Sequence, residues 1–278
     1  MEKTTKLTKQ IIISIFSILL CSCTYTHLGK TTINYEDSSY YIDGNRTINN
    51  NITTLNINWA AGNIYVISNE NQKSTIEIKE EITKGKDTTN KLVVRSFIDL
   101  NTLNIQFGYP GDYEINDFRK DLHISLSNDY NLDNLNIATI QGNIETSFKN
   151  VKNINAASTS SNFRGKDLDV DRLTFNSVSG DLYIDGKMKE IIMNSTSGNS
   201  NVTNYSSTSN NVFNTVSGDT IYNISSSCGY KASFSTISGT FTSNVEYLKS
   251  DGNYIYKEKN HEIKADSISG NLTINTIE

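Results

Sequence analysis

The feature that most constrains this chain is a twelve-residue pattern that returns about every 20 residues. In its clearest copy, Leu173–Ile184, alternating apolar residues flank a Ser-Val-Ser-Gly-Asp corner. Alternation with a period of two is typical of strands. The same frame fits seven more stretches: Leu55–Val66, Leu135–Thr146, Ile154–Gly165, Ile191–Val202, Asn211–Tyr222, Ala232–Ser243 and Ile263–Ile274.

The repeat predicts a stacked all-β architecture. One copy cannot bury its own apolar side, whereas stacked copies form a continuous core. Each copy offers two short strands and a corner, without a helical pattern between them. We therefore predict a β-solenoid, similar to a parallel β-helix, with coils of roughly 20 residues and a less regular N-terminal β region. Its inner columns should hold the aliphatic residues seven before and two after each corner glycine.

The corner glycines are the most specific positions of the repeat: Gly62, Gly142, Gly180, Gly198, Gly218, Gly239 and Gly270, with Ser161 in the equivalent place of one copy. Glycine suits a corner that needs a positive φ or a close approach of two backbones. The next residue is usually Asp or Asn, whose side chain can bond to nearby backbone groups in a turn. We predict structural repeat corners at these positions.

A column of serines precedes the glycines: Ser160, Ser179, Ser197, Ser217, Ser238 and Ser269. A catalytic serine needs a base beside it, and a column of equivalent serines gives no reason to select one. The chain also has no G-x-S-x-G motif. We interpret the column as structural, with hydroxyls bonding along the stack, and we predict no catalytic residues.

The N-terminus has the features of an export signal. Lys3, Lys6 and Lys9 precede the apolar run Ile11–Leu20, which is too short to span a bilayer. Leu20-Cys21-Ser22-Cys23 resembles the bacterial lipobox, which implies a signal peptide over residues 1–22 and lipidation of Cys23. Cleavage as an ordinary secretory peptide is the alternative. Two acyl chains are sufficient for stable membrane anchoring, so we expect an extracytoplasmic, lipid-anchored protein.

The remaining chain divides by its regularity. Residues 23–50 are polar and predict a tether that ends in a first β segment, with Tyr40 and Tyr41 as candidate caps of the first coil; a disordered spacer is the alternative. Residues 51–278 form the predicted solenoid domain. Within it, 51–134 should be irregular coils or a β-sheet cap, and 135–278 the regular repeats. We expect loops over Glu80–Asn90 and Tyr109–Glu114, and a hairpin or degenerate coil over 244–262.

The net charge argues against nucleic acid as a partner, and the cysteine content argues against an internal disulfide. The net charge is −5, and removal of residues 1–22 leaves −7, because that segment holds three lysines and one glutamate. An acidic chain without a basic stripe is a poor nucleic-acid ligand. Apart from the predicted lipidation site Cys23, Cys228 is the one cysteine beyond the signal peptide, and it is expected to pack as a small apolar residue. We predict no metal site and no cofactor, and interpret Asp112, Glu114 and Asp117 as a solvated loop.

Three parts of the repeat region are similar to coils of a known family. Leu55–Val66 resembles its opening coil, the Ser-Gly-Asp/Asn corners resemble its repeat, and Tyr254–Tyr256 followed by Ser267–Ile274 resembles its closing coils. Together they resemble the bacterial putative-adhesin family of β-solenoid domains over roughly residues 50–278. The chain departs from that pattern at Ser127–Asp129, where relatives often carry proline, and at Ser161. The resemblance implies the fold and, through the family's name, surface adhesion.

Three functions compete at this stage. The first is a non-catalytic envelope lipoprotein that presents a solenoid to a glycan, cell-wall or protein ligand. The second is a structural or signalling accessory of the envelope. The third is a polysaccharide-active enzyme on a β-helix, which would need paired carboxylates or a calcium cluster. Asp167, Asp169 and Asp171 alternate without completing a calcium loop, and the histidines have no recurring partner, so we favour the first.

Overall fold

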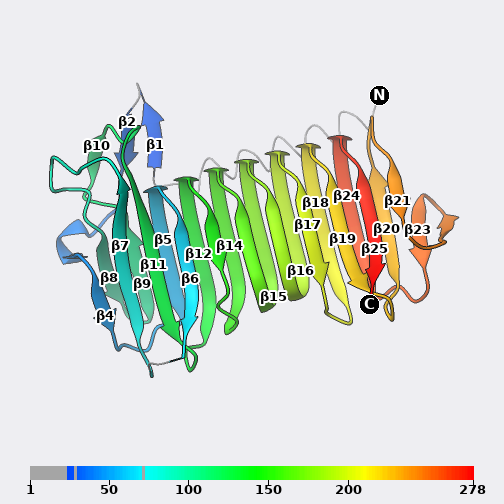
Figure 1. The fold of residues 1–278 in the computed structure, drawn as a ribbon, viewed down its shortest axis with the longest axis horizontal. Coiled ribbons are helices and arrows are strands. Elements are labelled where there is room, and N and C mark those ends of the chain that lie inside the picture. The colour runs from blue at the N-terminus through cyan, green and yellow to red at the C-terminus, as the bar shows by residue number, and fades with distance from the viewer. Residues whose placement is uncertain (1–23, 28–29, 71–72) are drawn as a thin grey trace.

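The computed structural model describes residues 24–27, 30–70 and 73–278, with side chains from Lys30 onwards. It is a β-solenoid whose coils lie side by side along the long axis of the molecule (Figure 1). Each coil contributes one strand to a first layer and one to a second layer. The first layer, in spatial order, contains β9 (Thr102–Gln106), β5 (Thr54–Ala61), β12 (Leu132–Gln141), β14 (Val151–Ser160), the later parts of β15 (Phe163–Ser179) and β16 (Leu182–Ser197), β18 (Ser209–Ser217), β24 (His261–Ser269) and β20 (Tyr230–Ser235).

The second layer continues from the first across the glycine corners. In order it contains β7 (Ile76–Lys84), β11 (Arg119–Ser127), β6 (Ile64–Asn69), β13 (Ile144–Thr146), the early parts of β15 and β16, β17 (Ser200–Asn204), β19 (Thr220–Ser225), β25 (Leu272–Ile277) and β21 (Phe241–Ser243). Neighbouring coils pair in parallel, whereas β7 pairs with β11 in the antiparallel sense.

The core lies between the two layers and follows the columns predicted from the sequence. In the first layer, Leu55, Leu135, Ile154, Leu173, Ile191 and Ile263 are buried. In the second, Ile64, Ile144, Phe163, Leu182 and Leu272 are buried, and Phe241 is half-buried at the end of the stack. Aligned apolar side chains lose contact with water on every coil, so the gain from burial is repeated along the axis.

The last repeat does not occupy the last place in the stack. β18 pairs with β24 through Phe213 and Ala265, and β24 pairs on its other edge with β20. In the second layer β25 lies between β19 and β21 in the same way. Figure 1 shows this coil in red between yellow and orange neighbours. The chain therefore leaves one coil position open, forms the next coil, and returns to fill the gap.

The insertion over 244–262 allows this return. It contains β22 (Leu248–Ser250) and β23 (Asn253–Tyr256), which form an antiparallel pair, and β23 also pairs with β20. The predicted hairpin is thus present. It covers the outer edge of β20 in the first layer. Without this cover, the unpaired backbone groups of β20 would be free to pair with a strand of another chain.

The N-terminal coils differ from the predicted loops in two places. β7 continues through Lys84, so the predicted loop over Glu80–Asn90 begins only at Gly85. β10 (Gly111–Tyr113) lies inside the predicted loop over Tyr109–Glu114, because it pairs with β2 (Lys30–Ile33). Both segments satisfy their backbone groups by pairing with strands distant in sequence, which local composition does not reveal.

Part of the predicted tether is also structured. β1 (Thr24–His27) pairs with β2, β3 (Ile42–Asp43) with β8 (Arg95–Asp99), and β4 (Arg46–Ile48) with β7. A short 3₁₀ helix, η1 (Ser38–Tyr40), precedes Tyr41, and both tyrosine rings pack against Phe97. Residues 30–50 therefore contact the irregular N-terminal coils. No helix within the described ranges is long and apolar enough to cross a membrane.

Candidate functional site

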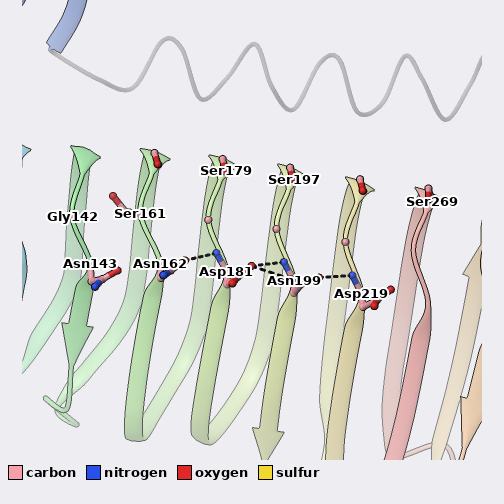
Figure 2. A pocket seen from close by; sticks show the side chains of 15 residues that line it. Gly142, Asn143, Ser161, Asn162, Ser179, Asp181, Ser197, Asn199, Asp219 and Ser269 are labelled. Carbon is pink, nitrogen blue, oxygen red and sulfur yellow. Dashed lines mark hydrogen bonds between the residues drawn. The ribbon is translucent and has the colours of Figure 1, made fainter.

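The glycine corners line up as one continuous polar groove with a volume of about 610 Å³ (Figure 2). Its walls are the stacked Ser-Gly-Asp/Asn segments from Gly142 to Asp219, together with Ser269. The residue after each corner glycine, and Asn162 after Ser161, contribute to a side-chain ladder. The backbone N–H of Asp181 donates to Asn162 Oδ1 at 2.9 Å, that of Asn199 to Asp181 Oδ1 at 2.8 Å, and that of Asp219 to Asn199 Oδ1 at 2.9 Å.

The ladder crosses the inserted coil without a break. Asn271 N–H donates to Asp219 Oδ1 at 2.8 Å, and Thr240 N–H donates to Asn271 Oδ1 at 2.9 Å. These bonds record the spatial order 219, 271, 240. Each side chain satisfies a corner N–H that the strand ladder leaves open, as an Asx turn does within one chain segment. The Asp and Asn side chains of these bonds therefore have a structural role, because each uses its Oδ1 to accept a backbone N–H bond. Their remaining lone pairs face the groove.

The corner glycines are required by close approach. A Cβ on Gly198 would lie 2.1 Å from the carbonyl oxygen of Gly180, and one on Gly218 would lie 2.0 Å from that of Gly198. Gly62 and Gly142 additionally have positive φ values of 116° and 121°. The sequence left two reasons open for glycine at a corner, a positive φ and a close approach of two backbones. Close approach to the neighbouring coil applies to all four of these glycines, whereas a positive φ applies only to Gly62 and Gly142.

The serine column does not form the predicted ladder. Among the described residues, no hydrogen bond joins Ser179, Ser197 or Ser217 to its counterpart on the next coil. Their side chains line the groove (Figure 2). The expectation was wrong because the residue after the glycine, and not the one before it, points along the axis at hydrogen-bonding distance. The hydroxyls of the groove serines are consequently available to solvent.

A second hydroxyl column lies inside the solenoid, two residues before the groove serines. It comprises Thr139, Ser158, Ser177, Ser195, Thr215, Thr236 and Ser267. These hydroxyls are buried without a hydrogen-bond partner in the described part of the chain, and several rest against the corner glycines. A small side chain is needed here because the neighbouring glycine brings the backbone close. The column therefore serves the packing of the corner and offers no reactive group to solvent.

Asparagine amides form two further ladders on the outer face of the first layer. In one, Asn155 Nδ2 donates to Asn136, Asn136 to Asn56, and Asn56 to Asn104, each at 2.9 Å. In the other, Asn214 donates to Asn194 at 2.9 Å, and Asn194 donates to Asn176 at 2.8 Å. A groove of about 470 Å³ lies where the two ladders meet. This is the second candidate for ligand binding.

A buried cation stabilises the N-terminal region. Lys120 is fully buried and its Nζ donates to Glu80 Oε2 and to the Leu92 carbonyl, while lying 4.6 Å from the centres of both the Trp59 and Phe107 rings. Burial lowers the pKa of Lys120 to about 8, although Glu80 opposes the shift. The arrangement encloses the ammonium on all sides, so its role is structural.

A buried polar network joins the inserted coil to its neighbours. His261 Nδ1 lies 2.6 Å from Ser209 Oγ, which lies 3.0 Å from the Tyr222 hydroxyl, and Asn211 Nδ2 donates to both oxygens. Burial lowers the pKa of His261 to about 4 and raises that of Tyr222 to about 12. Although a Ser–His pair can support catalysis, Ser209, Tyr222 and His261 are all buried within the solenoid. The network therefore acts as internal polar packing.

The other predicted residues can now be placed. All seven predicted glycines lie at stacked corners. Cys23 lies outside the described residues. Cys228 is a buried free thiol. Asp171 pairs with Lys189 at 2.6 Å, and Asp117 pairs with Lys84 at 3.0 Å. No group of three or more His, Cys, Asp or Glu side chains in the described ranges is arranged to hold a metal ion.

Comparison with known proteins decides the family. The profile of the Toastrack family, DUF4097, matches residues 52–219, more than half of the chain. The chain belongs to the Toastrack DUF4097 family. This assignment agrees with the solenoid described above and with the adhesin-like resemblance of its repeats. A search of curated proteins finds no significant match.

Among the solved structures that match, three bacterial proteins each align with 85% of this chain. A protein of Bacteroides fragilis named a putative adhesin is 18% identical, with 97% of its chain covered and a TM-score of 0.49. A putative cell adhesion protein of Clostridium sporogenes is 12% identical, with 100% covered and a TM-score of 0.33. A putative lipid binding protein of Parabacteroides distasonis is 15% identical, with 99% covered and a TM-score of 0.36. These similarities are too low to inform on function.

Proposed function

We propose that this chain is a non-catalytic lipoprotein of the bacterial cell envelope that uses the outer face of its solenoid to bind a glycan, cell-wall or protein ligand. The carrying observation is the pair of amide ladders from Asn104 to Asn155 and from Asn176 to Asn214, beside a hollow in the first layer. A regular row of amides offers repeated donors and acceptors to a ligand that is itself polar and extended.

The reactive groups of the chain support a role in binding over one in catalysis. The lining of the corner groove includes no histidine or lysine, and the carboxylates of Asp181 and Asp219 accept backbone N–H bonds from the next coil. The one Ser–His contact described above is buried within the core. A structural or signalling accessory of the envelope is the alternative, and it would use the same surface without a ligand from outside the cell.

Binding is tested with the purified protein on surfaces carrying cell-wall glycans, host-matrix proteins and intact bacteria, with released sugars assayed in the same samples. We expect saturable binding without products. Released products would contradict the non-catalytic assignment. Absence of binding in every sample would instead favour the accessory role.

Membrane anchoring is tested by mass spectrometry of the protein from the membrane fraction. We expect a chain that begins at Cys23 and carries a diacylglyceryl group. The matched variant Cys23→Ala should remain unmodified and lose its lipid anchor, whereas Cys21→Ala should be processed normally. Normal lipidation of Cys23→Ala would contradict the assigned site.

A further inference from the structure

The groove on the outer face of the first layer lies at a discontinuity in the amide ladders. Asn56, Asn136 and Asn155 occupy one outward column, and Asn176 occupies the next column. The strand register places Thr174 opposite Asn155, and Ala157 opposite Asn176. Neither neighbour can continue the amide ladder, since threonine has no amide and alanine has no polar atom. Each ladder therefore has an end that faces the groove.

The two ends have opposite hydrogen-bonding character. In both ladders each bond runs in the same direction, from the Nδ2 of one asparagine to the Oδ1 of its neighbour on the coil nearer the N-terminal end of the stack. Asn155 donates to Asn136, but no bond within the described chain uses its Oδ1 as acceptor. Asn176 accepts from Asn194, but no bond there uses its Nδ2 as donor. Where the two ladders meet, the groove thus presents the free carbonyl of Asn155 and the free amide of Asn176. Its far side adds the Asn58 side chain and the Asn104 Nδ2, which also make no side-chain bond in the described chain.

The positions of these two groups fit a small polyhydroxylated ligand. Asn155 and Asn176 lie on adjacent strands and are offset by two residues, so their Cα atoms are roughly 8 Å apart from strand spacing and rise. The free Oδ1 points toward β15 and the free Nδ2 toward β14, as the direction of the ladders requires. A pyranose ring can donate one hydroxyl to Asn155 and accept with another from Asn176.

The floor and charge of the groove restrict the ligand further. Ala138 and Ala157 are small and partly exposed, which creates a shallow apolar floor that suits the C–H face of a sugar. No ionisable residue lines the groove. The nearest charges in the next outward column, Arg172 and Glu190, are paired with each other. An anionic ligand would find no cation here, so a neutral ligand is favoured.

We propose that this groove binds a neutral oligosaccharide, with one sugar ring bridging the free carbonyl of Asn155 and the free amide of Asn176 above Ala157. The inference deepens the proposed function, on which it rests, by naming the ligand class and the residues that contact it. The chain of sugars would run across the strands, along the solenoid axis, where the Asn136 and Asn56 amides continue the row of hydrogen-bonding groups.

Isothermal titration calorimetry of the full-length protein with cellohexaose, xylohexaose, mannohexaose and chitohexaose tests the proposal. Binding of at least one saccharide is expected. The double variant Asn155→Ala/Asn176→Ala should weaken it roughly tenfold, the effect of losing about two hydrogen bonds, and Ala157→Leu should block it by filling the floor. Asn223→Ala is the matched control, because it removes an outward amide from the second layer, outside both ladders and the groove.

Each result has a defined meaning. Weakened binding in the groove variants with unchanged binding in Asn223→Ala would support the site. Equal binding by all variants would overturn it. If no neutral saccharide binds while the protein still binds envelope or host-matrix material, the ligand assignment is wrong and the proposed function stands. If nothing binds, both fail. Circular dichroism melting of each variant verifies that the solenoid is folded.

Discussion

The regular array and the N-terminal region are stabilised in different ways, although they share one stack of coils. From β12 to β19 most coils repeat the same apolar columns, glycine corner and Asx bond, although Ser161 replaces one glycine and Ser200, Asn211 and Thr220 interrupt the apolar columns. The N-terminal region instead depends on single arrangements, such as Lys120 enclosed by Glu80, Trp59 and Phe107. A repeated design distributes stability over many small, equal contacts, whereas an irregular region concentrates it in a few large ones. The exception in the array should be the glycine corner, where backbones meet directly.

The largest expected effect is therefore at a corner glycine. Gly218→Val places a Cβ 2.0 Å from the Gly198 carbonyl oxygen, a clash with backbone that no rotamer relieves. We expect loss of more than about 4 kcal/mol of unfolding free energy, or failure to fold. Gly252→Ala is the control, because its Cβ would meet nothing within 4 Å and only its φ of 75° causes strain. Unchanged melting of Gly218→Val would refute the close-approach explanation.

Lys120→Met tests the concentrated stability of the N-terminal region. Removing one partner of a buried ion pair leaves Glu80 without its cation, at an expected cost of about 3–5 kcal/mol in urea denaturation. The second change Glu80→Gln should recover part of this loss, since it removes the uncompensated carboxylate. A loss below about 1 kcal/mol, typical of an exposed pair, would show that the ammonium reaches water.

The inserted coil should be sensitive to acid through His261. Its folded pKa of about 4 is lower than the usual 6.5, so the unfolded chain binds the proton more readily between these values. Unfolding free energy should then fall as pH drops from about 6.5 toward 4, by about 2 kcal/mol between pH 7.5 and pH 5. Asp43 and Asp87, whose pKa values are lowered from 3.8, contribute in a more acidic range. In urea titrations at both pH values, His261→Gln should reduce the difference in unfolding free energy between pH 7.5 and pH 5. An unchanged difference would show that His261 is not its cause.

The smallest effect is expected at an inner hydroxyl of the array. Ser177 is buried without a partner in the described chain, so Ser177→Ala removes an unsatisfied polar group and should change the unfolding free energy by less than about 1 kcal/mol, in either direction. A larger loss in urea denaturation would indicate that a bound water satisfies the hydroxyl. Ser179→Ala, in the groove column, provides the comparison at an outward hydroxyl.

The regular array could be predicted from the sequence because its coils repeat one local pattern of apolar residues and corner residues. The apolar columns and the corner glycines follow from alternation and spacing alone. The place of the last coil does not, because Ala232–Phe234 and Ile263–Ala265 offer the same alternation to the edge of β18. Contacts between residues far apart, such as His261 with Ser209, favour one order over the other and are invisible to a periodic pattern.

A weaker signal did exist for the two internal polar groups. Lys120 shares its side of the strand with Leu122, Ile124 and Leu126, and His261 shares its side with Ile263. Read by alternation, both side chains must point inward, where an ionisable group needs a partner. The partner itself, Glu80 or Ser209, could not be identified because strand pairing over long separations is set by the whole fold.

Binding to isolated envelope material by two sets of variants tests the central claim, that the outer face of the array is the binding surface. One set is Asn155→Ala/Asn176→Ala, at the meeting point of the ladders. The other is Ile237→Ser/Leu248→Ser at the C-terminal end of the stack, where these side chains are 59% and 65% exposed. The account predicts that the first pair weakens saturable binding roughly tenfold and that the second leaves it unchanged. Loss of binding only in the second pair would place the binding surface at the end of the solenoid and contradict the claim.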